Sequence, residues 1–327
     1  MKETFYTEQE FKQTKDRLLN ALTMGHSVQK EPHGYLLVDT FRTARETLVD
    51  RFLQMEHGDV ISVFADDFLK DHPHADELCA RYGAEAASHA QAFSEKMALA
   101  LIEELEDARY NLVIGSTLMD SSSPFEPVTL RNRLMDCHYR DSLNVLFVRP
   151  EVSYLFLLRQ AAMKHADGRV SQKISMEQHY DDIQKMLDSL QMIDALHFFP
   201  DLRLFTIDGF CVYQALQTSC LSTAVMKEEF ARKLDPDEAA ALWNDYADAV
   251  ESSDEMEKIL AWFPQAFRQK VAEEAHAYFE KHKLDLVQKE VEIPYWQDVF
   301  VRKHDIDLSE VLKDALVDLW KKTGGHM

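Results

Sequence analysis

Residues 60–78 read VISVFADDFLKDHPHADEL, a short apolar run followed by acidic residues and the start of a helical segment. An apolar run at 60–64, short enough for a buried strand, is followed by two acidic residues, Asp66 and Asp67. A long, Ala-rich amphipathic segment at 76–108 predicts one helix, and a second apolar run follows within YNLVIGST at 110–117. Short apolar runs that alternate with long helical segments indicate βαβ units and a mostly parallel sheet.

The segments on either side of this stretch continue the alternation. Strands are predicted at 35–38, 142–148 and 201–206, and helices at 7–24, 43–56, 125–137, 151–165 and 176–196. Beyond residue 222 the strand pattern ends, and helix starts at Asp235 and Asp307 predict an all-helical region with an apolar stripe at 311–320. We therefore expect an N-terminal helix (1–30), an α/β domain with flanking helices (31–221) and a helical C-terminal region (222–327).

Composition excludes several classes of protein. The chain has 36 basic and 57 acidic residues and a formal charge of −21, so we expect neither nucleic acid nor an anionic membrane as a partner. No apolar window approaches a membrane span and the N-terminus has no signal-peptide core, which predicts a cytoplasmic protein. The four isolated cysteines are expected to be reduced and buried, and their spacing fits no zinc site.

Glycine is scarce, with nine in 327 residues, which is less than half of the usual share. A loop that binds phosphate through its backbone N–H groups needs several glycines within a few residues. No such loop occurs anywhere in this sequence.

The segment from Tyr35 to about residue 234 resembles the zeta toxins, which are P-loop kinases of bacterial toxin–antitoxin systems. These enzymes phosphorylate UDP-N-acetylglucosamine. The family's D-x-D-x-F…H-P segment corresponds to FADDFLKDHP, and its Y-N…E-G-T segment to YNLVIGST. The matching positions are Asp66, Phe68, His72, Pro73, Tyr110, Asn111 and Thr117. The resemblance implies a P-loop-kinase-like sheet, and it rests on a long colinear pattern.

The positions that carry the family's chemistry differ in this chain. Where the family has G-G-x-P-G-x-G-K-T, residues 38–47 read VDTFRTARET, with Arg45 at the lysine and Glu46 at the metal-binding threonine. Phe64 stands at the expected general base, although a one-residue bulge would bring Asp66 or Asp67 into that position, and Gly115 stands at the Glu of E-G-T. Two phosphoryl-stabilising arginines fall at Gln160 and Lys173. We predict that Arg45 and Arg42 form salt bridges with Asp39 and Glu46 that fill the vacated phosphate site.

These departures predict vestigial positions and no working site. Asp66, Asp67 and Thr117 remain on the acceptor side, and Arg45, Glu46 and Lys173 on the phosphate side. A metal site built from Asp66, Asp67, His72 and His74 is disfavoured, because their spacing matches no helical pair and Pro73 separates the histidines.

Two hypotheses about function remain. The favoured one is a catalytically inactive zeta-toxin-like pseudokinase that binds no cofactor and acts through a protein partner, as a regulator or antitoxin-like partner of an active toxin. The alternative is an ATP- and Mg²⁺-dependent UDP-amino-sugar kinase with a remodelled nucleotide site. The sequence leaves the partner and the oligomeric state open.

Overall fold

The computed structural model of the chain describes residues 5–39, 45–166 and 175–233 and the isolated positions 238, 239, 241, 242, 245, 246, 259 and 262. The chain divides into two compact units. Unit 1 comprises Met1–Val148, Arg169–Ser171 and Tyr180–Glu228, and unit 2 comprises Arg149–Gly168, Gln172–His179 and Glu229–Met327. Each unit is considered by itself below.

Within the described residues, the strands form one six-stranded sheet in the order β2-β3-β1-β4-β5-β6. The first five strands run parallel and β6 pairs antiparallel with β5. The predicted mostly parallel sheet is thus confirmed. The strands are β1 (His33–Val38), β2 (Ile61–Val63), β3 (Leu112–Ser116), β4 (Arg140–Leu146), β5 (Leu202–Phe205) and β6 (Cys211–Gln214).

Helices alternate with these strands, as the apolar periodicity predicts. They are α1 (Glu8–Thr23), α2 (Arg45–Met55), α3 (Ala75–Tyr82), α4 (Ala86–Asp107), α5 (Pro127–Asp136), α6 (Pro150–Ala166), α7 (Met176–Ala195) and α8 (Ser222–Ala231), with short 3₁₀ helices η1 (Ala65–Asp71), η2 (Gly83–Glu85) and η3 (Ala215–Gln217). In the described part of the chain, no helix has the length and apolar character needed to cross a bilayer.

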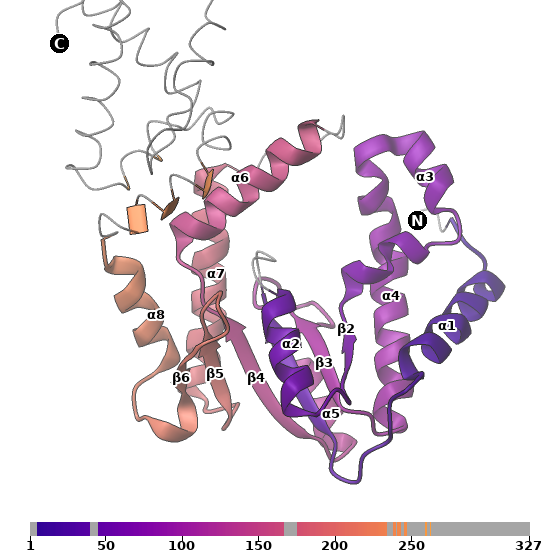
Figure 1. Cartoon of the computed structure of the whole chain (residues 1–327), viewed down its shortest axis with the longest axis horizontal. Helices are drawn as coiled ribbons and strands as arrows, with labels where there is room; N and C mark the ends of the chain where they lie inside the picture. Colours follow the sequence, from indigo (N-terminus) through magenta and orange to yellow (C-terminus); the bar gives the residue numbers. More distant parts are fainter. Residues whose placement is uncertain are drawn as a thin grey trace, which may run out of the picture. The chain divides into compact units, whose positions relative to one another are not determined.

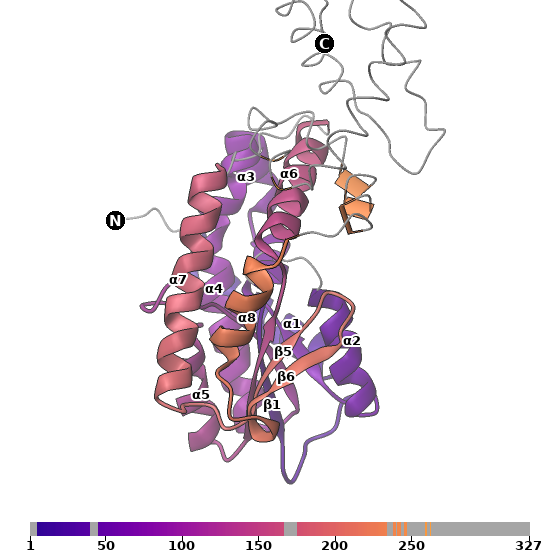
Figure 2. The same cartoon turned by 90° about the vertical axis from the view of Figure 1, so that its left-hand side faces the viewer.

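The strand order fixes which helices cover which face of the sheet. The connection from β1 through α2 to β2 moves across the sheet in one direction, and the connections through α4 and α5 move in the other. Because such crossovers are right-handed, α2 lies on one face and α4 and α5 lie on the other. Figures 1 and 2 show this arrangement, with α2 separated from α4 and α5 by the strands.

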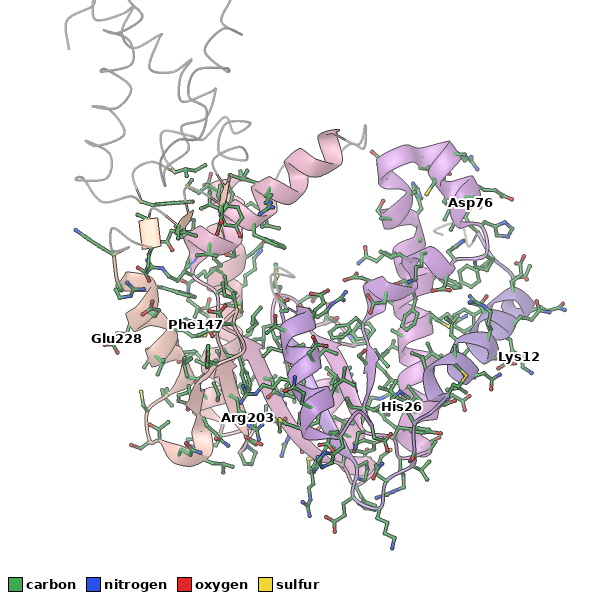
Figure 3. The ribbon with its side chains drawn as sticks, in the orientation of Figure 1. Lys12, His26, Asp76, Phe147, Arg203 and Glu228 are labelled. Carbon is green, nitrogen blue, oxygen red and sulfur yellow. The ribbon has the colours of Figure 1, made fainter. Side chains whose placement is uncertain are left out.

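The core lies between these layers. The side chains of β1, β3 and β4 that face α2 or α4 are almost completely buried. On the α2 face, Phe52 stacks on Tyr35 with ring centroids 4.4 Å apart, and side chains fill the space between helix and sheet (Figure 3). Such dense packing fixes the ends of the strands, where a site would be built.

The single helix predicted at 76–108 is wrong. The chain forms α3 and α4 with η2 between them, and Gly83 at the break has a φ of +55°. A side chain would be strained in that conformation, so this glycine ends α3 and lets the chain change direction. Tyr82 and Leu69 then pack with Phe5 on a small cluster formed by Leu78 and the first turn of α4.

The prediction also missed β6. Phe205 and Cys211 are the last pair of a hairpin whose turn contains Asp208 and Gly209, and Gly209 has a φ of +77°. An Asp-Gly pair between two apolar runs is a hairpin signal. This antiparallel strand makes β6 the edge of the sheet.

The cysteines depart from expectation as well. All four have free thiols, but Cys79, Cys211 and Cys220 are exposed and Cys137 is half-buried, so the prediction that they are buried is wrong. Burial raises the pKa of the Cys137 thiol. The predicted helix starts at Asp235 and Asp307 and the apolar stripe at 311–320 lie outside the described residues.

Candidate functional site

The candidate site lies where β1, β2 and β3 end and α2 begins. β3 pairs with both β1 and β2, so the carboxyl ends of these three parallel strands meet at one edge of the sheet. Ligands of open α/β sheets bind in the crevice beyond this edge. The residues that follow the strands are Asp39, Phe64 and Thr117, and α2 adds Arg45 and Glu46.

Arg45, in the first turn of α2, is engaged by neighbouring side chains. Its Nη2 donates a hydrogen bond to Asp67 Oδ1 at 3.0 Å. Its guanidinium carbon lies 4.5 Å from the centroid of the Phe64 ring, a cation–π distance. Glu46 is a weaker partner, because its Oε1 lies 3.8 Å from Arg45 Nε and its side chain is 80% exposed. The predicted salt bridge of Arg45 with Glu46 is present, but the shorter contact goes to Asp67.

Phe64, directly after β2, packs against Gly115 in β3. The Phe64 side chain is buried, and a Cβ placed on Gly115 would lie 2.5 Å from Phe64 Cδ1. Side-chain carbons do not approach so closely, so the ring occupies the space that any side chain at position 115 would need. The two residues are therefore sterically coupled: a large ring at one strand end fits a glycine on its neighbour.

The remaining acceptor-side residues are placed by local structure. Asp66 and Asp67 are half-buried in the first turn of η1. Thr117 Oγ1 accepts a hydrogen bond from the backbone N–H of Met119 at 3.3 Å, and the Thr117 N–H donates to Phe125 O at 3.0 Å. The structure thus brings Arg45 together with Asp67 and Phe64, while Thr117 hydrogen-bonds within the loop that follows β3.

His72 belongs to a packing cluster. It is buried, its ring centroid lies 4.8 Å from that of Phe93, and its Nδ1 accepts a hydrogen bond from the His74 N–H at 3.0 Å. Burial lowers the pKa of His72, and the neighbouring His74 adds to this effect. Among the described residues, no group of three or more His, Cys, Asp or Glu side chains is arranged to hold a metal ion.

Several predicted positions cannot be placed. Lys173 and residues 40–44, which include Arg42, lie outside the described residues. Gln160 is described only as part of the α6 backbone.

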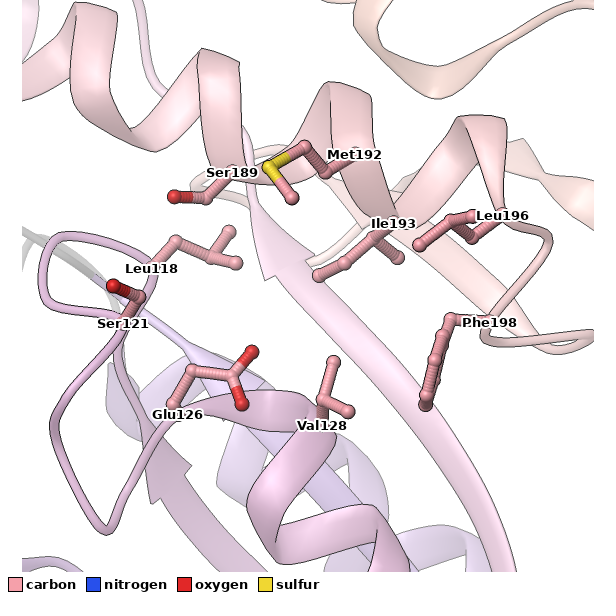
Figure 4. Close-up of a pocket in the computed structure, with 9 residues that line it drawn as sticks. All are labelled: Leu118, Ser121, Glu126, Val128, Ser189, Met192, Ile193, Leu196 and Phe198. Atoms are coloured by element: carbon pink, nitrogen blue, oxygen red, sulfur yellow. The ribbon is translucent and has the colours of Figure 1, made fainter.

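A cavity of about 210 Å³ lies on the opposite face of the sheet, between the loop after β3, α5 and the second half of α7 (Figure 4). Its lining is mostly apolar, with the carboxylate of Glu126 at one side. That carboxylate accepts a hydrogen bond from the Thr129 N–H at 2.9 Å and caps α5. The Glu126 carboxylate therefore stabilises the start of α5.

Sequence reasoning found the substitutions at Phe64 and Gly115 but missed that they contact each other. The available signal was that, relative to the family pattern, the side chain at the end of one strand is larger and the side chain at the end of the next strand is smaller. The contact between Arg45 and Asp67 was missed because it depends on how η1 turns after β2.

Comparison with known proteins agrees with the predicted resemblance. A family model described as zeta toxin matches residues 42–218. The toxin PezT of Streptococcus pneumoniae is 28% identical over 225 residues, which cover 68% of this chain and 87% of the toxin. The toxin zeta of Streptococcus pyogenes is 26% identical over 231 residues, which cover 70% of this chain and 79% of that toxin.

The fold agrees too. A chain from the solved structure of the PezAT chromosomal toxin–antitoxin system of Streptococcus pneumoniae superposes with a TM-score of 0.62 at 26% identity, covering 71% of this chain and 92% of that one. The P-loop-kinase-like sheet predicted from the sequence is therefore confirmed.

Proposed function

Since the chain belongs to the zeta toxin family, we propose that it is a catalytically inactive, cytoplasmic pseudokinase of that family. It acts through protein–protein interaction, as a regulator or antitoxin-like partner of an active toxin. One observation carries the proposal. Of the residues at the family's lysine, base and acceptor-side glutamate positions, Arg45 lies over Phe64 and Phe64 packs on Gly115, and none of the three is the group that the family uses there.

The state of Arg45 supports the loss of phosphate binding. A kinase needs a cation that is free to reach the transferred phosphates and a metal-binding hydroxyl beside it. Arg45 is held between Asp67 and the Phe64 ring, and Glu46 places a carboxylate where a phosphate would need a cation. Binding of ATP would have to break the ion pair and bring like charges together.

The acceptor side supports the loss of catalysis. Phosphoryl transfer to a sugar hydroxyl needs a carboxylate that accepts the proton, and Phe64 has none. Asp66 and Asp67 follow it in η1, and Asp67 is paired with Arg45. A glutamate in place of Gly115 would collide with the Phe64 ring. The family's lysine, metal-binding threonine and first aspartate are replaced together in the sequence, which favours an inactive scaffold over a weakened kinase.

A protein partner follows from the family. The PezAT relative is one component of a toxin–antitoxin system, and a copy that keeps the scaffold without the chemistry can bind what the active copy binds. The charge of −21 disfavours nucleic acid as that partner.

Calorimetric titration of the full chain with ATP and Mg²⁺, and separately with UDP-N-acetylglucosamine, tests the proposal. We expect no saturable heat for ATP up to about millimolar concentrations. The binding free energy would then be no more favourable than about −4 kcal/mol. A pull-down with an active zeta toxin as bait then tests whether such a toxin is the partner of this chain.

The alternative, a UDP-amino-sugar kinase with a remodelled site, predicts a different result. ATP would bind in the micromolar range, and Arg45→Ala would abolish that binding because Arg45 would replace the family's lysine. Arg17→Ala, an exposed arginine of α1 paired with Asp71 at 2.7 Å, is the matched control and should leave binding unchanged. Saturable ATP binding that is lost in Arg45→Ala and kept in Arg17→Ala would refute the inactive pseudokinase.

A further inference from the structure

The edge of the sheet carries an uncharged segment that the proposed function does not use. Asp, Glu, Lys and Arg make up 28% of the chain, yet none occurs from Gly209 to Met226, the longest stretch without them. This segment, called the uncharged strip below, contains the whole of β6, η3 and the beginning of α8. Such a composition is unusual for the surface of a chain with a charge of −21.

Most of the strip up to Leu221 is nevertheless on the surface, while Tyr213, Ser222, Thr223 and Met226 are buried. Phe210 is 69% exposed, Val212 48% and Leu216 66%, and Leu221 is exposed as well. Figure 2 shows β6 beside β5 on the side of unit 1 that faces the viewer. Contiguous exposed apolar residues of this kind mark interaction surfaces.

Its backbone is suited to pairing with another strand. β6 is the last strand of the sheet, so within the described residues its outer edge pairs with no strand. Edge strands are usually protected by lysine, proline or inward-pointing charge, and the strip contains none of these. Tyr213 is turned into unit 1 and its hydroxyl donates to Cys220 O at 2.9 Å, which holds the following loop against β6.

Two arginines beside β6 are engaged within unit 1, while the charges that flank the strip in sequence, Asp208 and Lys227, are exposed. Arg203, opposite Gln214 in the sheet, forms a two-point ion pair with Asp201, with N–O distances of 2.8 and 2.5 Å. Arg51 donates a hydrogen bond to Gly209 O at 2.6 Å. The arginines beside β6 are therefore not available to select an acidic partner, and the exposed charges lie only at the two ends of the strip.

We infer that the uncharged strip is a self-association surface, where β6 pairs antiparallel with β6 of a second copy across a two-fold axis. Charge decides for a second copy. Two chains of −21 repel each other overall, and a residue near a two-fold axis faces its own copy, so an uncharged strip on that axis avoids opposing like charges. The strip is the longest segment that meets this condition.

The size of the surface predicts a weak dimer. Stable interfaces use about 20–30 residues on each side, and the strip alone is smaller than that. We therefore expect a reversible dimer with a Kd on the order of 10 µM, tightened by salt because screening reduces the repulsion between the acidic copies.

Sedimentation velocity of the full chain over about 1–200 µM tests the inference. Reductant is included, because Cys211 and Cys220 are exposed and could form disulfide-linked species. We expect the mass to rise with concentration from 37.9 kDa towards twice that value. Val212→Lys should weaken association at least about tenfold, because a lysine on an edge strand blocks edge-to-edge pairing.

Val28→Lys is the matched control. Val28 is 61% exposed between α1 and β1 and outside the strip, so the same change of residue and charge should leave dimerisation intact. An added lysine lowers the net negative charge, so a general charge effect would strengthen association in both variants. Phe210→Lys provides a second strip variant, and unchanged melting temperatures show that all variants fold.

Three outcomes would overturn the inference. The wild-type chain could remain a monomer at the highest concentration, which would leave the edge open to a strand of a different protein. Val212→Lys and Phe210→Lys could dimerise like the wild type. Val28→Lys could lose association as fully as the strip variants. The inference is independent of the proposed function, because none of these results depends on nucleotide binding.

Discussion

The contact between Phe64 and Gly115 makes the sharpest prediction. Gly115→Ala adds one methyl group, whose carbon would lie 2.5 Å from Phe64 Cδ1 and 3.2 Å from Phe64 Cε1. In the wild-type background the ring must move, and its buried position against Arg45 limits where it can go. In a Phe64→Ala background the ring is absent and the methyl group has room. The effect of the same alanine should therefore change sign between the two backgrounds.

The magnitude can be worked out from these contacts. Overpacking a buried site by one carbon costs about 1–3 kcal/mol, whereas replacing a strand glycine by alanine gains about 0.5–1 kcal/mol where there is room. We expect Gly115→Ala to lower the free energy of unfolding by about 1–2 kcal/mol in the wild type and to raise it by about 0.5–1 kcal/mol in Phe64→Ala. The coupling free energy is then about 1.5–3 kcal/mol, within the range for residues in contact.

Hydrogen exchange of peptides from β2 and β3, followed by mass spectrometry, is the suitable assay. Unit 1 must be read separately from unit 2, and all four tryptophans lie beyond residue 242, so tryptophan fluorescence does not report on this site. Exchange gives the opening free energy of the two strands in each of the four proteins of the cycle. Equal destabilisation by Gly115→Ala in both backgrounds would refute the packing of Phe64 on Gly115.

Three further predictions concern the scaffold. Asn111→Ala should lower the opening free energy of β1 and β3 by about 2–4 kcal/mol, measured by the same hydrogen exchange, because this buried amide holds three backbone and side-chain partners across the amino ends of the strands; a loss under about 0.5 kcal/mol would contradict it. Asp194→Ala should lower the melting temperature and raise exchange in α8, because Asp194 accepts hydrogen bonds from the Thr223 N–H and the Ser222 hydroxyl; Asp194→Asn, which keeps one acceptor, should lose less. The hydrogen bond with Glu77, more than any other cause, raises the pKa of His74. The stabilisation that protonated His74 provides is therefore complete below a pH of about 6.5 and is lost as the pH rises through the raised pKa. The difference in melting temperature between the wild type and His74→Gln should shrink from pH 6 to pH 9, and a constant difference would contradict the prediction.

Much of the fold was predictable because its signals are local. Each parallel strand is a short apolar run between helical segments, and this pattern can be read from the sequence alone. The errors arose where one residue with unusual backbone geometry decides the path. Gly83 divides a continuous helical pattern, and Gly209 turns the chain back into β6.

The site was less predictable, because its contacts join residues that are far apart in the sequence. Arg45 and Asp67 could be recognised as a cation and a carboxylate, but their ion pair depends on η1. The contact of Phe64 with Gly115 depends on the pairing of β2 with β3. The sequence predicted which residues lack the family's chemistry and could not predict that the replacements fit one another.

The residues that this chain shares with the family pattern have structural partners. Phe68 and His72 are buried in unit 1, with His72 against Phe93. Asn111 accepts a hydrogen bond from the His33 N–H at 2.9 Å and donates to Asp59 O at 3.0 Å, joining two strands and the turn before a third. These residues hold the ends of the strands in place whether or not a reaction takes place there.

The replaced residues differ from the shared ones in what they contact. Phe64 fits Gly115, and Arg45 lies on Phe64 and pairs with Asp67, so each replacement is the partner of another. Random loss of catalytic groups would leave cavities or unpaired charges at the strand ends, and both are costly. A retained scaffold with a mutually packed site is the state expected when selection acts on the fold as a binding partner and no longer on phosphoryl transfer. Restoring one group, as in Phe64→Asp, would then place a carboxylate beside Asp67 and empty the space over Gly115, and stability should fall without any gain in ATP binding.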